Sequence, residues 1–336
     1  MSAASGSLEV RNLRKQFMIG GGLFGPERKI VRAVNDVSFR IPKGTSLGLV
    51  GESGCGKSTV ARALLRLIEP DAGSVVFGGV DVRAAKGSAL RKLRRRMQIV
   101  FQDPYSSLNP RRTIRQALEE PLWVHRLGTR QEIAEKVEIA IREVGLSKEA
   151  LDRYPHEFSG GQRQRIGIAR ALVLDPELIV ADEPVSALDV SVQAQILGLL
   201  ENLREKRGLS FLFVSHDLGV IRHFCDRVCV MYLGRIVEEG RTEEVLDRPL
   251  HPYTKLLRDS SPVPDPSVRL TLTKIMGEVP SPANPPPGCT FHPRCSRAAG
   301  SCLTTIPAFT EHGQGRSVSC YHPENWAEQP PVAAAS

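Results

Sequence analysis

The sequence lacks the segments that mark secreted and membrane-spanning chains. Its 336 residues contain no run of about 18 apolar residues, the minimum for a helix that crosses a membrane. The opening stretch, MSAASGSLEV, has no basic segment followed by an apolar one, so no signal peptide is predicted. We therefore expect a cytoplasmic protein whose cysteines stay reduced.

Aromatic residues are scarce, which bears on nucleic-acid binding. They make up 5% of the chain, whereas the formal net charge is +8, and a positive charge favours nucleic acid or an anionic membrane surface. The densest basic run, RKLRRR at Arg91 to Arg96, contains no aromatic residue for base stacking. We favour the solvated face of a helix over a nucleic-acid patch, which remains the weaker alternative.

Short apolar stretches separated by helical patterns predict an α/β fold. Helical periodicity runs through Gln131 to Val144 and Gln193 to Arg207. Strands buried on both faces are predicted at 46–51, 97–102, 178–182 and 211–216. Two other segments alternate, VSFRI at 37–41 and a hairpin at Arg227 to Gly240, and they predict a small antiparallel sheet beside the main one.

The composition changes near residue 260. More than half of the 24 prolines lie from Ser261 onward, and proline disfavours long helices and central strands. We therefore predict one large domain, residues 1–260, and a small proline- and cysteine-rich extension, residues 261–336. No solenoid repeat is present.

The motif GESGCGKST, Gly51 to Thr59, predicts a phosphate-binding loop. It fits G-x-x-x-x-G-K-[ST], follows the apolar strand and precedes the helical VARALLRLI. Its glycines let backbone N–H groups point at phosphates, Lys57 adds a positive charge, and Ser58 offers a hydroxyl to Mg²⁺. The predicted ATP-binding residues are Gly51, Glu52, Ser53, Gly54, Cys55, Gly56, Lys57, Ser58 and Thr59.

Two further segments carry polar groups at the ends of structural elements. In LIVADEP an apolar strand ends in Asp182, predicted to hold Mg²⁺, and Glu183, predicted to polarise the attacking water. In FSGGQ, Ser159 and Gln162 fit a capping box, and Gly160 and Gly161 leave the helix start open to an anion. Alone, this second segment is equally compatible with an ordinary helix start.

Together the three motifs resemble those of the ATP-binding-cassette (ABC) ATPase family, with GESGCGKST as Walker A, LIVADEP as Walker B and FSGGQ as the signature. The resemblance spans roughly Leu8 to Ser260. It implies a RecA-like P-loop core, an antiparallel β subdomain and a helical subdomain at about 103–170. It also implies that two ATPase domains pack head to tail, so that the signature residues grip ATP bound mainly by the partner.

The same resemblance assigns further positions. Gln102 in VFQDP matches the Q-loop glutamine that contacts Mg²⁺ or water, and His216 in FVSHD matches the switch histidine at the γ-phosphate. Asp189 belongs to SALD, which matches the D-loop, and Phe17 is the candidate for stacking on adenine. Glu183, His216 and Gln102 are thus the expected catalytic residues.

Longer matches resemble the ATPases of dipeptide/oligopeptide importers. They include VFQDPYSSLNPR, ADEPVSALDVSVQAQ, HPYT and GEVPSPANPPPGC. The resemblance implies two transmembrane permease subunits, a second ATPase in a heterodimer, an extracytoplasmic substrate-binding protein and no nucleic acid, with the chain peripheral at the cytoplasmic face of the inner membrane. Nickel or glutathione import is an alternative, and a soluble ABC ATPase acting on nucleic acid or ribosomes is a weaker one.

Four of the seven cysteines, Cys289, Cys295, Cys302 and Cys320, lie in the extension, separated by 5, 6 and 17 residues. This is no CxxC pattern, so scattered buried thiols are as good an interpretation from spacing alone, as expected for Cys225 and Cys229. A segment with little core of its own favours a metal centre, either Zn²⁺ or an iron–sulfur cluster. The importer resemblance favours [4Fe–4S].

Overall fold

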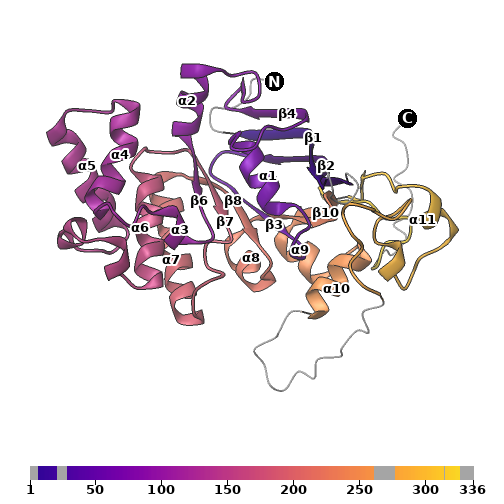
Figure 1. Ribbon diagram of the computed structural model, residues 1–336. Helices are drawn as coiled ribbons and strands as arrows, with labels where there is room; N and C mark the ends of the chain where they lie inside the picture. The colour runs from indigo at the N-terminus through magenta and orange to yellow at the C-terminus, as the bar shows by residue number, and fades with distance from the viewer. Residues whose placement is uncertain (1–6, 21–28, 261–276, 314, 326–336) are drawn as a thin grey trace, which may run out of the picture.

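The computed structural model of the protein describes residues 7–20, 29–260, 277–313 and 315–325 (Figure 1). A main sheet of eight strands has the order β11-β12-β10-β9-β3-β8-β7-β6, and a small sheet of four has the order β2-β1-β4-β5. The first eight strands are β1 (Leu8–Ile19), β2 (Lys29–Ile41), β3 (Ser46–Val50), β4 (Ala72–Phe77), β5 (Val80–Asp81), β6 (Met97–Val100), β7 (Leu178–Asp182) and β8 (Ser210–Ser215). The last four are β9 (Arg227–Tyr232), β10 (Arg235–Arg241), β11 (Thr310–Glu311) and β12 (Ser317–Val318).

The centre of the main sheet is parallel and buried. Strands β6, β7, β8 and β3 pair in parallel, and all residues of β3, β7 and β8 are buried. These are the four predicted apolar strands, and the prediction of an α/β fold is confirmed. Polar groups that follow such strands collect at their carboxyl ends, along one edge of the sheet.

The antiparallel part differs in one respect from the prediction. The segment 37–41 lies in β2 of the small sheet, with Val37, Phe39 and Ile41 buried on one face as expected. The hairpin of β9 and β10, however, belongs to the main sheet, because β9 pairs in parallel with β3. Its turn uses positive φ angles at Leu233 (42°) and Gly234 (82°), as a tight hairpin requires.

Helices cover the main sheet and form a separate group at one end (Figure 1). The predicted helices are confirmed as α5 and α7, and helices α4, α5 and α6 pack on one another beyond the β6 edge. The helices are α1 (Lys57–Leu64), α2 (Gly87–Arg96), α3 (Pro104–Ser107), α4 (Ile114–His125), α5 (Arg130–Glu143), α6 (Gly160–Leu172), α7 (Val190–Arg207), α8 (Leu218–Phe224), α9 (Thr242–Asp247), α10 (Pro252–Ser260) and α11 (Gly300–Thr304). Within the described residues, no helix combines the length and apolar character needed to cross a membrane.

The basic run forms the last two turns of α2, as the helix interpretation predicts. Arg94 donates to the carbonyl oxygens of Leu65 and Arg66 at 3.0 and 2.7 Å, and Arg96 forms an ion pair with Glu177. Two of its arginines thus hold neighbouring segments in place.

The C-terminal extension joins the main sheet and its core. Strand β12 pairs antiparallel with β10. The fully buried Glu238 of β10 accepts a hydrogen bond of 2.8 Å from Arg316 of the extension. Phe291 packs edge-on against Tyr232 of β9 and belongs to the same apolar core as the helices. The predicted boundary at 260–261 lies at the edge of the described residues and stays a prediction.

Candidate functional site

The loop between β3 and α1 has a backbone that only glycine can adopt at two points. Gly51 and Gly56 have φ angles of 154° and 109°, and a Cβ atom would lie 2.1 Å from the carbonyl oxygen of Met231 and 2.0 Å from that of Ala33, respectively. Neither neighbour can give way, because both are backbone atoms. The loop is therefore pressed against β2 and the β9–β10 hairpin, and the start of α1 faces a pocket.

Lys57 and Ser58 begin α1 at the mouth of this loop. Lys57 is 4% exposed, and its Nζ donates to the carbonyl oxygens of Gly51 and Glu52 at 2.6 and 3.1 Å. Ser58 donates its hydroxyl to Asp182 Oδ1 at 2.9 Å. Burial raises the pKa of Asp182, which the hydrogen bond from Ser58 opposes. A cation that joined Asp182 would stabilise its charged form.

Glu183 follows Asp182 and brings two predicted residues together. Its Oε2 lies 3.2 Å from both Gln102 Nε2 and His216 Nδ1, so three segments far apart in the sequence meet at one carboxylate oxygen. Glu183 has a φ of 49°, which is unfavourable for a residue with a side chain, and its N–H donates to Val214. Strained backbone of this kind is concentrated at functional sites.

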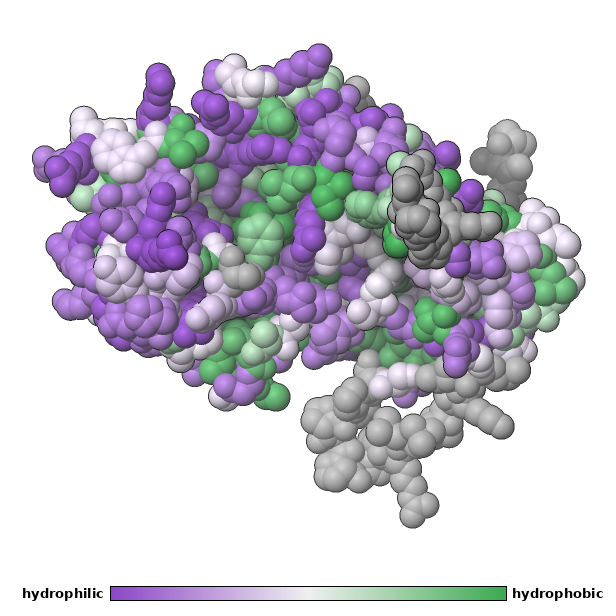
Figure 2. Space-filling model, viewed as in Figure 1, coloured by the Kyte–Doolittle hydropathy of each residue, from purple (hydrophilic) through white to green (hydrophobic). Residues whose placement is uncertain are grey.

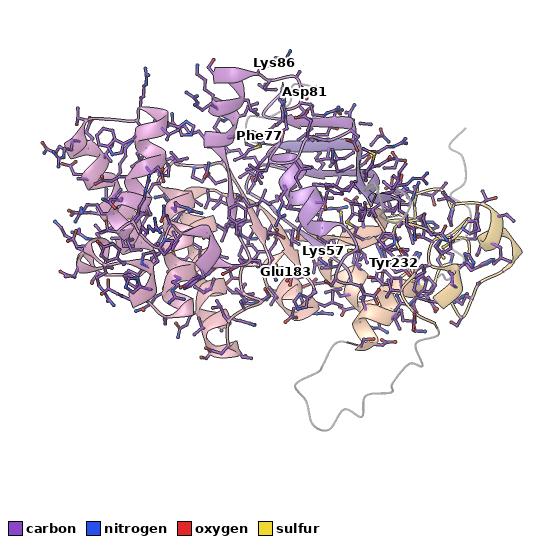
Figure 3. The ribbon with its side chains drawn as sticks, viewed as in Figure 1. Lys57, Phe77, Asp81, Lys86, Glu183 and Tyr232 are labelled. Carbon is purple, nitrogen blue, oxygen red and sulfur yellow. The ribbon has the colours of Figure 1, made fainter. Side chains whose placement is uncertain are left out.

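One pocket of about 540 Å³ collects nine of the residues predicted for the nucleotide site. Figure 3 shows Lys57 and Glu183 near each other at the centre of the molecule. The sequence analysis did not single out Ala33, the remaining lining residue. The lining residues are Ala33, Ser53, Gly54, Gly56, Lys57, Ser58, Thr59, Gln102, Glu183 and His216.

Five other predicted residues lie outside that pocket. Ser159 caps α6, and Gln162 completes the capping box, while Ser159 and Gly160 are exposed. Gly161 approaches α7 so closely that a Cβ atom would lie 2.5 Å from Val192 Cγ1. Asp189 caps α7 by accepting from the Val192 N–H at 3.0 Å, and this bond lowers its pKa. In a single chain the signature therefore faces outward.

Three more of the predicted residues do not line the pocket, and each packs against or contacts another part of the chain instead. Phe17 is half-buried on β1 beneath Lys15, whose Nζ lies 5.5 Å from the ring centre, and it does not line the pocket. Cys55 is buried, and burial raises the pKa of its thiol. Glu52 turns away from the pocket toward the C-terminal extension.

The residues at Ser58 and Asp182 fit a magnesium ion by their chemistry. Mg²⁺ prefers oxygen ligands and is usually held by one or two carboxylates together with substrate phosphates. A hydroxyl and a buried carboxylate 2.9 Å apart supply such oxygens, and Gln102 lines the same pocket as Ser58.

The four predicted cysteine ligands share a second, small pocket, here called the four-cysteine pocket. Cys289, Cys295, Cys302 and Cys320 all line it. The predicted packing of Cys225 and Cys229 is confirmed, since both are buried and neither lines this pocket. Burial raises the pKa of Cys289 and Cys295, and raises that of Cys320 to about 12.

The spacing within the four-cysteine pocket does not suit a single ion. In the part of the chain that the structure describes, no three side chains of His, Cys, Asp or Glu lie close enough together to hold one metal ion. Backbone N–H groups nevertheless face several sulfurs, and that of His322 lies 3.3 Å from Cys320 Sγ. Neither the predicted zinc ion nor the predicted iron–sulfur cluster is therefore evident from the geometry.

Two contacts to the P-loop were not predicted from the sequence. The hydroxyl of Tyr253 in α10 accepts a hydrogen bond of 2.8 Å from the Glu52 N–H. Arg294 forms an ion pair with the Glu52 carboxylate. Tyr253 lies in the HPYT motif, which the sequence analysis quoted only for its resemblance. No pattern in the sequence marks Arg294.

Comparison with known proteins identifies two families that match parts of this chain. Residues 34–186 match the family described as ABC transporter, and residues 237–302 match oligopeptide/dipeptide transporter, C-terminal region. The oligopeptide transport ATP-binding protein AppF of Bacillus subtilis is 52% identical over 94% of this chain and 96% of its own length. The dipeptide transport ATP-binding protein DppF of Haemophilus influenzae is 47% identical, with the same coverage.

Solved structures give the same result for the fold. The dimeric post-hydrolysis state of the ATP-binding cassette MJ0796, bound to ADP and phosphate, has a TM-score of 0.62 and 29% identity, and covers 70% of this chain and 98% of that one. The structure of cbiO1 from Clostridium perfringens has a TM-score of 0.61 and 27% identity, and covers 71% and 90%. The chain therefore belongs to the ABC transporter family of ATP-binding proteins, and it carries the C-terminal region described for oligopeptide/dipeptide transporters.

Proposed function

We propose that this chain is the ATP-hydrolysing subunit of a membrane importer of dipeptides or oligopeptides. The observation that carries the proposal is the 52% identity with an oligopeptide transport ATP-binding protein, which extends over 94% of the chain and so includes most of the extension. The constellation of Lys57, Glu183 and His216 around one pocket supports hydrolysis as the chemical step.

The polar groups of the pocket and its surroundings suit the successive steps of ATP hydrolysis. Backbone N–H groups of residues 51–59 and the start of α1 receive the phosphates, and Lys57 adds a positive charge. A magnesium ion held by Ser58 and Asp182 would neutralise charge that develops on the phosphates. Glu183, within 3.2 Å of Gln102 and His216, accepts the proton of the attacking water while those two side chains orient it.

The exposed signature supports a head-to-tail dimer. Ser159 and Gly160 lie at the open start of α6, away from the pocket of their own chain, so they are free to meet the nucleotide of a partner. In this arrangement Asp189 and the signature of one subunit complete the site of the other. We propose a second ATPase subunit as the partner, in a heterodimer.

The helical end carries a surface suited to permease subunits. A groove of about 500 Å³ is lined by α4, where Trp123 and Val124 are 46% and 55% exposed. Tyr105, close after Gln102 in the sequence, is 55% exposed. Figure 2 shows a few hydrophobic residues scattered over this otherwise hydrophilic end. We propose that two permease subunits dock here, which places the chain at the cytoplasmic face of the membrane, and that an external binding protein delivers the solute.

Reconstitution tests the proposed function. We expect the purified ATPase pair to hydrolyse ATP faster when it is joined to its permease in liposomes, and faster again when a peptide-loaded binding protein is present. Parallel assays replace the peptide with nickel or glutathione, or replace the permease with DNA or ribosomes. Stimulation by nickel, by glutathione or only by nucleic acid would contradict peptide import.

We propose further that the four-cysteine pocket holds a [4Fe–4S] cluster. Four cysteines around one pocket supply the number of thiolates that such a cluster takes, and a cluster spans more space than a single ion. N–H groups directed at the sulfurs are among the contacts that tune such centres. A bound cation would also offset the burial that raises the pKa of Cys320. The assigned role is structural or regulatory.

Metal analysis tests the cluster. We expect anaerobically purified protein to contain about four iron and four sulfide per chain, with the broad visible absorbance of an iron–sulfur centre. Cys320→Ser should lower the iron content, whereas Cys229→Ser, in the core of β9, should not. One equivalent of zinc without iron would contradict the cluster and support the alternative ion.

A further inference from the structure

A partly buried ion pair ties the P-loop to the C-terminal extension. Arg294 donates from Nη1 and Nη2 to the two carboxylate oxygens of Glu52 at 2.8 and 2.9 Å, across 242 positions of sequence. The Arg294 side chain is 3% exposed and that of Glu52 is 27% exposed. A two-pronged contact fixes orientation as well as distance, so Glu52 can move little without moving the extension.

The extension side of this pair is held in aromatic packing. The guanidinium of Arg294 lies 5.9 Å from the ring centre of Tyr232 and 5.8 Å from that of Phe291. Tyr253 packs on both rings, with centres 4.6 and 5.4 Å away, and its hydroxyl accepts from the Glu52 N–H. Figure 3 shows Tyr232 between the P-loop and the extension. Displacement of Arg294 therefore disturbs a packed cluster.

The P-loop side of the pair leads directly to the phosphate-binding groups. The carbonyl oxygen of Glu52 accepts from Lys57 Nζ at 3.1 Å and from the Cys55 N–H at 3.2 Å. A shift of Glu52 thus reaches Lys57 through one hydrogen bond. At the other end, Arg294 is directly followed by Cys295 of the four-cysteine pocket.

We propose that Arg294 is a positioning residue for ATP binding, which acts from the extension by holding Glu52 and with it the P-loop. The affinity for ATP then depends on the folded state of the extension. By thermodynamic linkage, ATP in turn stabilises the extension around the four-cysteine pocket. The proposal rests on ATP binding at the P-loop, and it depends neither on what the four thiols hold nor on which solute is imported.

Equilibrium binding of a non-hydrolysable ATP analogue to the full chain tests this coupling. We expect Arg294→Gln and Glu52→Gln each to weaken binding by roughly 5- to 150-fold, the usual range of coupling between sites. The double variant should bind about as weakly as either single variant, because both changes remove the same interaction. The exchanged pair, Glu52→Arg with Arg294→Glu, should recover part of the affinity.

Arg297→Gln is the matched control. Arg297 lies in the same extension, lines the four-cysteine pocket and pairs with Glu324 at 3.1 Å, and its side chain is 44% exposed. We expect this variant to bind the analogue as the wild type does. Affinity within about twofold of wild type in both Arg294→Gln and Glu52→Gln, or full additivity in the double variant, would overturn the proposal.

Amide hydrogen exchange reads the coupling in the opposite direction. We expect the analogue to slow exchange in the peptide that contains Arg294 and Cys295, followed by mass spectrometry, in the wild type and in Arg297→Gln but not in Arg294→Gln. A role in folding alone would not remove this dependence on nucleotide. If Arg294→Gln fails to fold, Glu52→Gln decides both measurements, because its carboxyl group lies on the partly exposed loop. Hydrogen exchange in this peptide that does not change with the nucleotide in the wild type also counts against the proposal.

Discussion

Glu183→Gln is expected to leave ATP binding intact and to lower the rate of hydrolysis by roughly 10²- to 10⁴-fold, the usual contribution of a general base. The amide keeps the shape of the side chain and its contacts with Gln102 and His216, but it cannot accept the proton of the attacking water. ATP then stays bound at the interface, and the closed dimer should accumulate. Phosphate release and gel filtration with ATP measure the two effects.

Glu177→Gln is the matched control, because Glu177 lies at the opposite end of β7 and pairs with Arg96 outside the pocket. We expect this variant to hydrolyse ATP at close to the wild-type rate. Turnover close to wild type in Glu183→Gln would instead exclude Glu183 as the base, and attention would pass to His216.

Gly56→Ala should weaken ATP binding severely. Its Cβ atom would lie 2.0 Å from the carbonyl oxygen of Ala33, and its φ of 109° is unfavourable for alanine. The backbone must shift, and α1, with Lys57 and Ser58 at its start, must shift with it. We expect the affinity to fall more than about 100-fold, which corresponds to about 3 kcal/mol.

Gly54→Ala separates steric clash from backbone strain. Gly54 also has a positive φ, 79°, but no atom lies within 4 Å of the place of its Cβ. Only the conformational preference changes, at a cost of about 1–2 kcal/mol. We therefore expect a loss of affinity of about tenfold, measured by the same titration. An equal loss in both variants would show that contact with Ala33 does not set the shape of the loop.

The sequence predicted the core of the site because local patterns encode it. GESGCGKST after an apolar strand defines a strand, a loop and a helix over a few residues, and the structure has β3, the P-loop and α1 at those places. The carboxyl ends of parallel strands meet at one sheet edge. Because Glu183 and His216 follow β7 and β8, this topology brings the two side chains close together.

Features set by distant contacts were not predictable in this way. The β9–β10 hairpin alternates like a strand of any antiparallel sheet, and only its pairing with β3 places it in the main one. No local pattern links Arg294 to Glu52, because partners 242 positions apart are chosen by the packing of the whole chain. The roles of Phe17 and Asp189 remain predictions for the same reason, since they depend on a ligand or a second subunit.

The pairing of β12 with β10 has a consequence for the solubility of the chain. Strand β10 would otherwise be the outermost strand of the main sheet, with a row of unpaired backbone groups that could recruit a strand of another molecule. The extension covers part of this edge at Glu238 and Glu239. It therefore also protects the chain against edge-to-edge aggregation. Removing the extension would expose unpaired backbone groups of β10, even if every nucleotide-binding residue stayed in place.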